Sequence, residues 1–198
     1  QAAGETLPGP REELMDLILI GLVVVVGLYL IVSYNGLVKA RQMAKEAWSG
    51  IDVQLKRRAN LIPNLVETVK GYATHEMETF SWVTELRARA GQVDDDDVAG
   101  RAQSEAMLGD ALVKLMAVAE AYPELKANKN FQDLQQQLSE IEGEIQMSRR
   151  YYNGAARALN VKVESFPSNL IANNFGFAQM DYFEIENAAD RAVPEVSF

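Results

Sequence analysis

The chain has 198 residues, of which 48% are hydrophobic and 24% are charged, and its formal net charge is -9. This length suits one domain with an appendage, and the absence of cysteine excludes disulfides, thiol nucleophiles and cysteine-bound zinc or iron–sulfur centres. The single histidine, His75, excludes catalytic triads and two-histidine metal sites within one chain, and the acidic balance argues against a nucleic-acid-binding protein.

The charges are segregated along the chain. Residues 1–16 carry a net charge of -3, whereas residues 17–32 carry no charge at all. A basic stretch with a net charge of +4 follows between Lys39 and Arg58, and the remaining residues are strongly acidic. An uncharged apolar block followed by a basic stretch and an acidic body is not typical of an ordinary soluble protein.

Residues 17–34 are predicted to form a transmembrane helix, because an α-helix of this length is ~27 Å long and a bilayer core is ~30 Å thick. A buried core helix would rarely be apolar on every face, and an interfacial helix would need a polar face. A cleaved signal peptide would begin with a basic segment, whereas residues 1–16 are acidic. Because basic residues are denser after the block, the positive-inside rule places residues 1–16 outside the cell and the large domain in the cytoplasm.

The basic stretch divides into two groups with different predicted contacts. The residues nearest the apolar block are predicted to contact anionic lipid headgroups, with ~1 kcal/mol from each: Lys39, Arg41 and Lys45. The second group lies ~35 Å along a straight helix, beyond the ~8–10 Å screening length. This group is therefore expected to contact acidic helices of the same subunit or of a neighbour, and consists of Lys56, Arg57 and Arg58.

Hydrophobic residues at helical spacing predict four helices within residues 35–166. The first is expected to continue unbroken from Leu17 to about Asn60, and Pro63 is expected to end it or to open the second. The second is expected to carry an apolar stripe between Ile62 and Val83, and the third a stripe between Leu108 and Tyr122. Glycine or proline predicts the remaining breaks, at 91–93, 122–124 and 166–168.

The fourth predicted helix carries a heptad seam, which is typical of bundle packing and consists of Phe131, Leu138, Ile145, Tyr152, Leu159 and Phe166. Short connections between long amphipathic helices favour antiparallel neighbours. The predicted fold is therefore all-α: a single N-terminal transmembrane helix (17–34) continuous with an antiparallel four-helix bundle (35–166). An irregular tail (167–198) is expected to follow, with a short helix around residues 180–190.

Two segments are candidate interaction sites. The first contains Arg149, Arg150, Tyr151 and Asn153, and its arginines either pair with acids such as Glu142 or Glu164 or bind a partner or a headgroup. The second is apolar and predicted to be non-helical. It either covers one end of the bundle or forms a patch for another protein, and its candidate residues are Phe166, Pro167, Leu170, Ile171, Phe175 and Phe177.

The residues predict no cofactor and no metal site. The run Asp94–Asp97 lacks the ligand spacing of a calcium loop and is better placed to cap the next helix. His75 has no second histidine, and the glutamates of the predicted bundle lack the Glu-x-x-His pairs of carboxylate-bridged metal sites. We therefore expect a protein that is not an enzyme.

The chain resembles the LemA family from about Tyr34 to its C-terminus. The resemblance is carried by AWS at 47–49, IDVQLKRR at 51–58, LIPNLVETVKGYA at 61–73, AEAYPELKA at 119–127, RRYYN at 149–153, FPSNL at 166–170 and PEVSF at 194–198. It implies a bacterial inner-membrane protein with an external N-terminus and a cytoplasmic helical bundle. It implies no catalytic residues, because the family has no established enzymatic activity.

Two functions are consistent with these observations. The first is a self-associating scaffold or organiser of the inner membrane, in keeping with the association of one relative in this family with membrane remodelling. The second is an adaptor for membrane proteolysis or envelope quality control, in keeping with its association with membrane peptidases. The expected partners are the lipid bilayer, further copies of the chain and, for the adaptor, a membrane protease or another envelope protein; nucleic acid is not expected.

Overall fold

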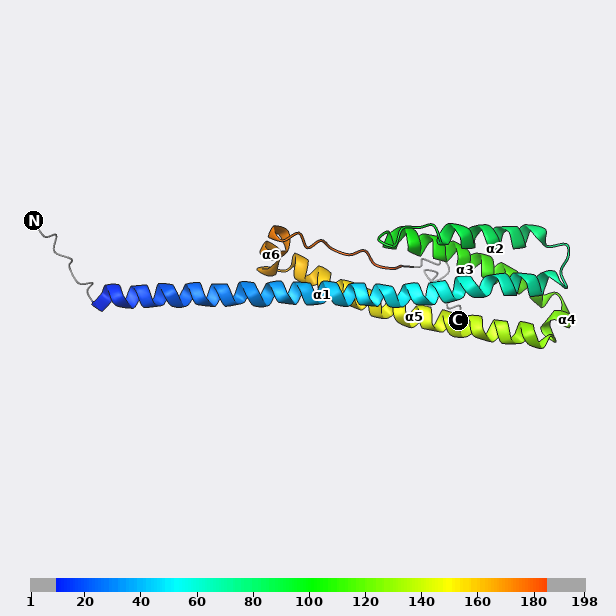
Figure 1. Cartoon of the computed structure of the whole chain (residues 1–198), viewed down its shortest axis with the longest axis horizontal. Helices are drawn as coiled ribbons and strands as arrows, with labels where there is room; N and C mark the ends of the chain where they lie inside the picture. The colour runs from blue at the N-terminus through cyan, green and yellow to red at the C-terminus, as the bar shows by residue number, and fades with distance from the viewer. Residues whose placement is uncertain (1–9, 185–198) are drawn as a thin grey trace, which may run out of the picture.

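The computed structural model describes residues 10–184, and these residues form helices and connecting segments without a strand (Figure 1). The helices are α1 (Pro10–Lys70), α2 (Met77–Ala90), α3 (Val98–Glu120), α4 (Pro123–Lys126), α5 (Lys129–Glu164) and α6 (Ser168–Asn174). The predicted all-α class is confirmed.

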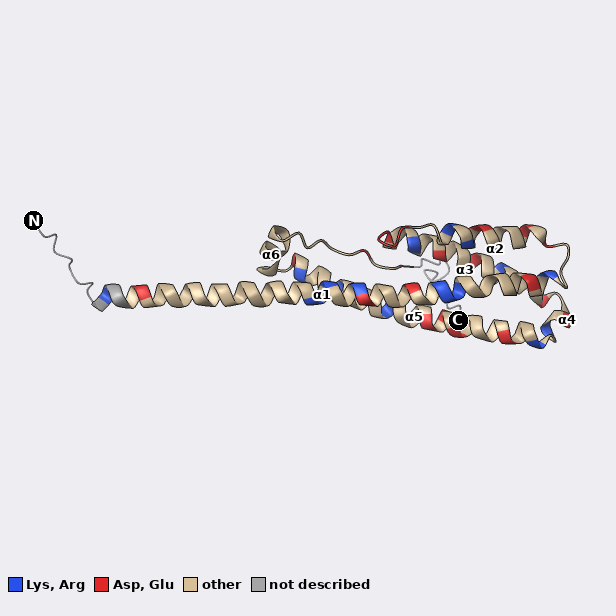
Figure 2. Cartoon of the chain, viewed as in Figure 1, with Lys and Arg blue, Asp and Glu red and all other residues tan. Residues whose placement is uncertain are grey.

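Helix α1 has 61 residues and is ~90 Å long. Its first half projects alone from the packed body, and Figure 2 shows a long uncharged stretch in this half. The apolar side chains there are exposed, from Leu14 (59%) to Val32 (70%). Among the described residues, the apolar part of α1 is the segment that is long and apolar enough to cross a membrane. A bilayer would cover these apolar side chains of α1, which the rest of the described chain leaves exposed.

The prediction that Pro63 ends or opens a helix is wrong, because α1 continues through Pro63 to Lys70. A proline inside a helix lacks the N–H that would bond to the carbonyl four residues earlier, which here belongs to Ala59. That carbonyl accepts a hydrogen bond from Nε of Arg87 at 2.6 Å instead. A side chain from α2 therefore satisfies the group that the proline leaves unpaired, and the helix continues.

Because α1 continues through Pro63, the second predicted helix is divided between α1 and α2. Of its apolar stripe, Ile62, Val66 and Val69 lie on α1, whereas Phe80 and Val83 lie on α2. All of these side chains are buried, so the stripe was assigned to the core correctly and to one helix wrongly. The cause is the loop between Lys70 and Met77, which contains no proline.

The body consists of a long helix pair and a hairpin (Figure 1). Helix α5 lies along α1, and the order of their contacts, Arg58 with Glu142 and Trp48 with Tyr152, shows that the pair is antiparallel. Helices α2 and α3 pack mainly against each other and contact α1. Contacts between α3 and α5 are few, so these two helices leave the body open on one side.

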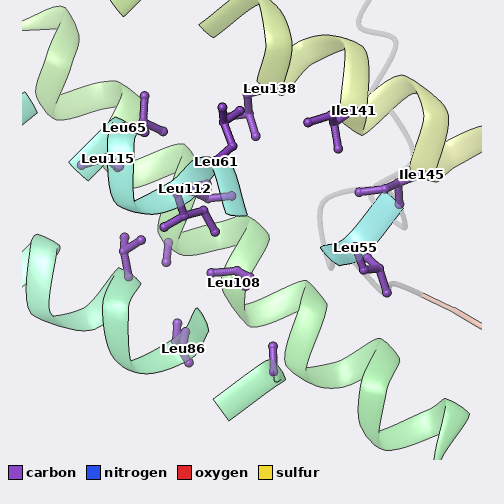
Figure 3. Packing of buried hydrophobic residues seen from close by; sticks show 14 of the residues in the cluster. Leu55, Leu61, Leu65, Leu86, Leu108, Leu112, Leu115, Leu138, Ile141 and Ile145 are labelled. Atoms are coloured by element: carbon purple, nitrogen blue, oxygen red, sulfur yellow. The ribbon is translucent and has the colours of Figure 1, made fainter. Parts of the chain in front are cut away.

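Leucine and isoleucine side chains from α1, α2, α3, α4 and α5 contribute to the main core, as Figure 3 shows for Leu55, Leu86, Leu112 and Ile141. The heptad seam of α5 is buried at Phe131, Leu138, Ile145, Tyr152 and Leu159, but Phe166 is 80% exposed. The seam therefore ends with α5, which stops at Glu164.

The helix ends near 91–93 and 122–124 agree with the sequence-based expectation, and Asp97 caps α3 by accepting a bond from the Gly100 N–H at 2.8 Å. The tail differs. A short helix forms at Ser168–Asn174, whereas no helix forms at Met180–Glu184. Residues 185–190 of the expected helix lie outside the described residues.

Candidate functional site

The body contains a buried ion-pair network centred on Arg58. The Arg58 side chain is 2% exposed, and its guanidinium donates hydrogen bonds to the carboxylate of Glu105 on α3 and to Oε1 of Glu142 on α5, the latter at 2.7 Å. Burial alone would lower the pKa of Arg58, but the attraction of Glu142 and Glu105 outweighs it and raises the pKa above its usual value. Arg58 therefore remains charged and joins three helices.

The network extends along α3 and back to α1. Nε of Arg101 donates to Oε1 of Glu105 at 2.9 Å, and Arg101 also lies 3.5 Å from Oδ1 of Asp52. Asp52 in turn pairs with Lys56, and this pair raises the pKa of Lys56. Three cations and three carboxylates thus balance, which is the condition under which buried charges are tolerated.

The three consecutive basic residues of α1 have different environments. Within residues 10–184, Arg58 is the one of the three that pairs with acidic residues on other helices. Lys56 pairs with Asp52 and Arg57 donates to Oε1 of Gln54, both on α1 itself. Within one chain the expected contact with acidic helices is therefore found for Arg58; Lys56 and Arg57 are exposed, and their contact with a neighbouring subunit stays a prediction.

A groove lies between α3 and α5, with the ion-pair network at its base. Its volume is about 540 Å³, and its apolar lining includes Val113, Met116 and Leu138. Asp110, Glu120 and Glu142 make its polar lining acidic. Val113 is 70% exposed, although a helix that closed the bundle would cover it. The groove thus offers an apolar surface with an acidic rim.

Among residues 10–184, no group of three or more histidine, cysteine, aspartate or glutamate side chains is arranged to hold a metal ion. Two of the carboxylates that line the groove, Glu105 and Glu142, accept hydrogen bonds from Arg58. These ion pairs hold α1, α3 and α5 in register with one another.

The segment 149–153 holds the tail through Tyr152 and Asn153. The side-chain amide of Asn153 bonds to both backbone groups of Phe183, at 2.9 and 3.2 Å. The Tyr152 hydroxyl donates to the Asp181 carbonyl at 2.7 Å, and burial, followed by the charge of Asp181, raises the pKa of Tyr152 to about 12. Trp48 packs against Tyr152 and Phe183 with ring centroids 5.3 and 5.5 Å apart.

A second asparagine, which the sequence interpretation missed, repeats this contact. Asn160 lies seven residues after Asn153 and bonds to both backbone groups of Met180 at 2.9 Å. The two asparagines lie seven residues apart beside the apolar seam of α5, and this spacing is the feature of the sequence that could have identified both contacts. Together, the two amides hold the extended tail along α5 as a neighbouring strand would.

The other members of the segment face outward. Tyr151 is 57% exposed and Arg150 is also exposed, whereas Arg149 is half-buried. Within residues 10–184, neither arginine forms an ion pair. The acids that were expected to pair with them are engaged elsewhere, Glu142 with Arg58 and Glu164 with Gln179.

The prediction that the apolar segment 166–177 is non-helical is wrong, because α6 (Ser168–Asn174) occupies most of it, and its two faces differ. Ile171 and Phe177 are buried in a second core with Leu37 and Leu159, and Pro167 is half-buried. The opposite face exposes Phe166, Leu170 and Phe175. The two alternatives, a cover for one end of the bundle and an exposed patch, therefore both describe part of the segment.

The three residues predicted to contact headgroups, Lys39, Arg41 and Lys45, differ in their exposure. Lys39 and Lys45 are exposed. Arg41 is half-buried, and its guanidinium carbon lies 4.7 Å from the centroid of the Phe177 ring. A cation–π contact of this kind holds Arg41 against the body, so the two lysines are the more accessible charges.

Comparison with known proteins places this architecture in a family. Two magnetosome proteins MamQ of Paramagnetospirillum magneticum are each 26% identical over 209 residues, which cover 93% of this chain and 76% of the relative. Protein LemA of Metamycoplasma hominis is 28% identical over 153 residues, which cover 76% of this chain and 68% of that protein. The model of the LemA family matches residues 47–198. The chain belongs to the LemA family.

Proposed function

We propose that this protein is a non-enzymatic, membrane-anchored scaffold that self-associates on the cytoplasmic side of a bacterial inner membrane. The observation that carries the proposal is the open groove between α3 and α5, which stands on a helix continuous with the apolar segment. The names of the MamQ relatives place those proteins at the magnetosome, and this supports a role connected with membranes.

The groove has a complementary surface on the same chain. On the outer side of α5, Met147 (50% exposed) and Tyr151 (57% exposed) lie one helical turn apart, and Arg150 and Arg157 are exposed beside them. At ~100° per residue, Met147 and Tyr151 lie ~100° or more around α5 from the groove-lining residues Leu138, Glu142 and Gln146, whereas Arg150 lies one turn from Gln146, at the edge of the groove. An apolar and basic surface suits a groove with an acidic rim.

A contact between these two surfaces joins different faces of successive copies. Such a head-to-tail interface leaves one face free at each end, so it propagates into a ring or a filament. Self-association through the body is therefore expected to give species larger than a dimer.

Substitution of Val113 with glutamate tests the interface, because it places a charge in the apolar part of the groove. The mass of the detergent-solubilised full-length protein, measured by light scattering, is expected to fall to that of a monomer. Val53→Glu is the matched control: Val53 is a 51% exposed valine on α1, and its substitution should leave the mass unchanged. Tyr151→Ser should dissociate the protein as Val113→Glu does.

Mixing the two variants sharpens the test. Each variant retains one intact surface, so a mixture of Val113→Glu and Tyr151→Ser protein should form dimers that cannot grow further. A wild-type protein that is strictly monomeric at all concentrations would overturn the scaffold. A wild-type oligomer that neither variant dissociates would overturn this interface.

The adaptor function would place a helix of a different membrane protein in the same groove. It predicts a monomeric wild-type chain and co-purification of a partner that Val113→Glu abolishes. The self-associating scaffold is favoured because the complementary surface is present on the chain itself.

The proposed orientation has residues 1–16 outside and the body in the cytoplasm, supported by the basic residues that follow the apolar segment. The natural absence of cysteine permits single-cysteine labelling. Ala3→Cys should react with a membrane-impermeant maleimide in intact spheroplasts, whereas Ser139→Cys, at an exposed position on α5, should react only after lysis. The opposite labelling pattern would show the reverse orientation.

A further inference from the structure

The corner where α5 ends and α6 follows lies against the part of α1 next to the apolar segment. Ile171 and Ala172 of α6 pack with Leu37 and Ala40 of α1 in the second core. Figure 1 shows α6 at the end of the body that is nearest to the projecting half of α1. We refer to residues 162–177 as the membrane-proximal corner.

Aromatic contacts fix the height of this corner along α1. The ring of Tyr34 lies 5.0 Å from the ring of Phe175 and 5.7 Å from that of Phe177, measured between centroids. Nζ of Lys162 lies so close to Gly36 that a Cβ at Gly36 would be 3.0 Å from it. Phe175 and Lys162 are therefore level with Tyr34 and Gly36, where the predicted span ends.

Three apolar side chains of the corner face away from the body. Phe166 is 80% exposed, Phe175 is 63% exposed and Leu170 is 54% exposed, while Ile171 of the same helix is buried. At Gly176 the backbone adopts a φ of 68°, which glycine tolerates best, and the chain turns there to place Phe177 in the second core. The packing of Ile171 and Phe177 in the second core thus fixes the position of the exposed side chains on the opposite face.

We propose that the membrane-proximal corner is a second membrane contact, in which Phe166, Leu170 and Phe175 insert into the interfacial region of the bilayer that α1 crosses. The partner is the phospholipid itself. If the apolar segment spans a membrane, headgroups surround Tyr34, and a side chain in contact with Tyr34 lies among them. Aromatic residues are enriched at this level of membrane proteins, and apolar faces of interfacial helices enter ~5–10 Å into the headgroup region.

The charges at the corner are consistent with this placement. Lys39 and Lys162 are both exposed and lie at the level of the corner. Their long side chains can extend to phosphate groups while the apolar residues enter the bilayer. The nearby acid, Glu164, accepts a hydrogen bond from Gln179 at 2.7 Å. The inference rests on the membrane anchor and does not depend on self-association.

Depth-dependent fluorescence quenching in liposomes tests the proposal with the full chain. Single-cysteine variants Phe166→Cys, Leu170→Cys and Phe175→Cys carry an environment-sensitive fluorophore, and the lipids are brominated near the top of the acyl chain. Val32→Cys, within the predicted span, is the positive control, and Val53→Cys, ~28 Å farther along α1 than Tyr34, is the negative control. Val53 and Leu170 are nearly equally exposed in the chain, at 51% and 54%.

The expected result is loss of fluorescence in brominated lipid at the three corner positions, together with blue-shifted emission, as at Val32 and unlike Val53. Quenching by aqueous iodide at all three positions, at the level seen for Val53, would overturn the proposal. Shielding from both bromine and iodide would also overturn it, because protein would then cover the corner. Unchanged helicity by circular dichroism verifies that each variant is folded. Monomeric protein serves equally well, so the result is independent of the scaffold test.

Discussion

Replacement of Arg58 with methionine is expected to lower the free energy of unfolding by about 3–5 kcal/mol. The Glu105 side chain is 2% exposed and, among the described residues, would keep Arg101 alone as an ion-pair partner without Arg58, while Glu142 would lose its partner on α1. A buried carboxylate that loses its main partner keeps its desolvation cost and loses the attraction that offset it. The change is measured by chemical denaturation of the detergent-solubilised protein, followed by circular dichroism.

Arg57→Met is a matched control on the adjacent residue. Arg57 is exposed and bonds only to Gln54 among the described residues, so its loss is expected to change the free energy of unfolding by no more than ~0.5 kcal/mol. A double variant, Arg58→Met with Glu105→Leu, should recover part of the loss, because it removes the buried carboxylate that has lost its main partner while Arg101 keeps Asp52. Equal effects of Arg58→Met and Arg57→Met would show that the network contributes no more than a surface pair.

Replacement of Asn160 with alanine is expected to release the tail from α5 locally. The substitution removes both hydrogen bonds that hold Met180, and at ~1–1.5 kcal/mol each the loss is ~2–3 kcal/mol. Hydrogen exchange at the Met180 amide should therefore accelerate by ~30- to 150-fold. The change is measured by amide hydrogen exchange with mass spectrometry or NMR.

Asn130→Ala provides the control, because Asn130 is an exposed asparagine on the same helix. It should leave exchange at Met180 unchanged. Exchange at Phe183 should increase less than at Met180 in the Asn160 variant, since Asn153 still holds Phe183. Uniform acceleration throughout the body would instead indicate global destabilisation, contrary to a local role for Asn160.

The parts of the fold that depend on local pattern could be predicted from the sequence. The apolar segment is visible as an uncharged block, and the buried face of α5 is visible as a heptad repeat, because each pattern follows from the period of one helix. The cap at Asp97 likewise depends on residues within one turn. Such features require no knowledge of a neighbouring element.

The parts that depend on contacts between distant residues could not be predicted in the same way. The passage of α1 through Pro63 requires Arg87, which is 28 residues from its acceptor Ala59 and has no sequence pattern in common with it. The different environments of Arg57 and Arg58 depend on which side of α1 faces Glu105 and Glu142. A basic triplet in the sequence does not identify the one residue that is buried.

The tail shows the same limit at the candidate site. The segment 166–177 is apolar throughout, and only the packing of Ile171 on Leu37 and Ala40 distinguishes the buried side chains from Phe166, Leu170 and Phe175. Asn160 is polar yet buried, because its partner is backbone from twenty residues away. Hydrophobicity along the sequence therefore located the segment but not its two faces.

Because α1 is continuous, a change in the tilt of its apolar segment moves the whole body. From Tyr34 to Lys70 the helix is ~54 Å long, with no break between the apolar segment and the body. A change of ~10° in the tilt of the buried segment would displace the far end of the body by ~9 Å, and tilt is one way in which a helix adapts to bilayer thickness. Bilayer thickness could thus set the spacing at which neighbouring bodies meet. A change in local lipid composition that alters this thickness would then change the distance between neighbouring proteins.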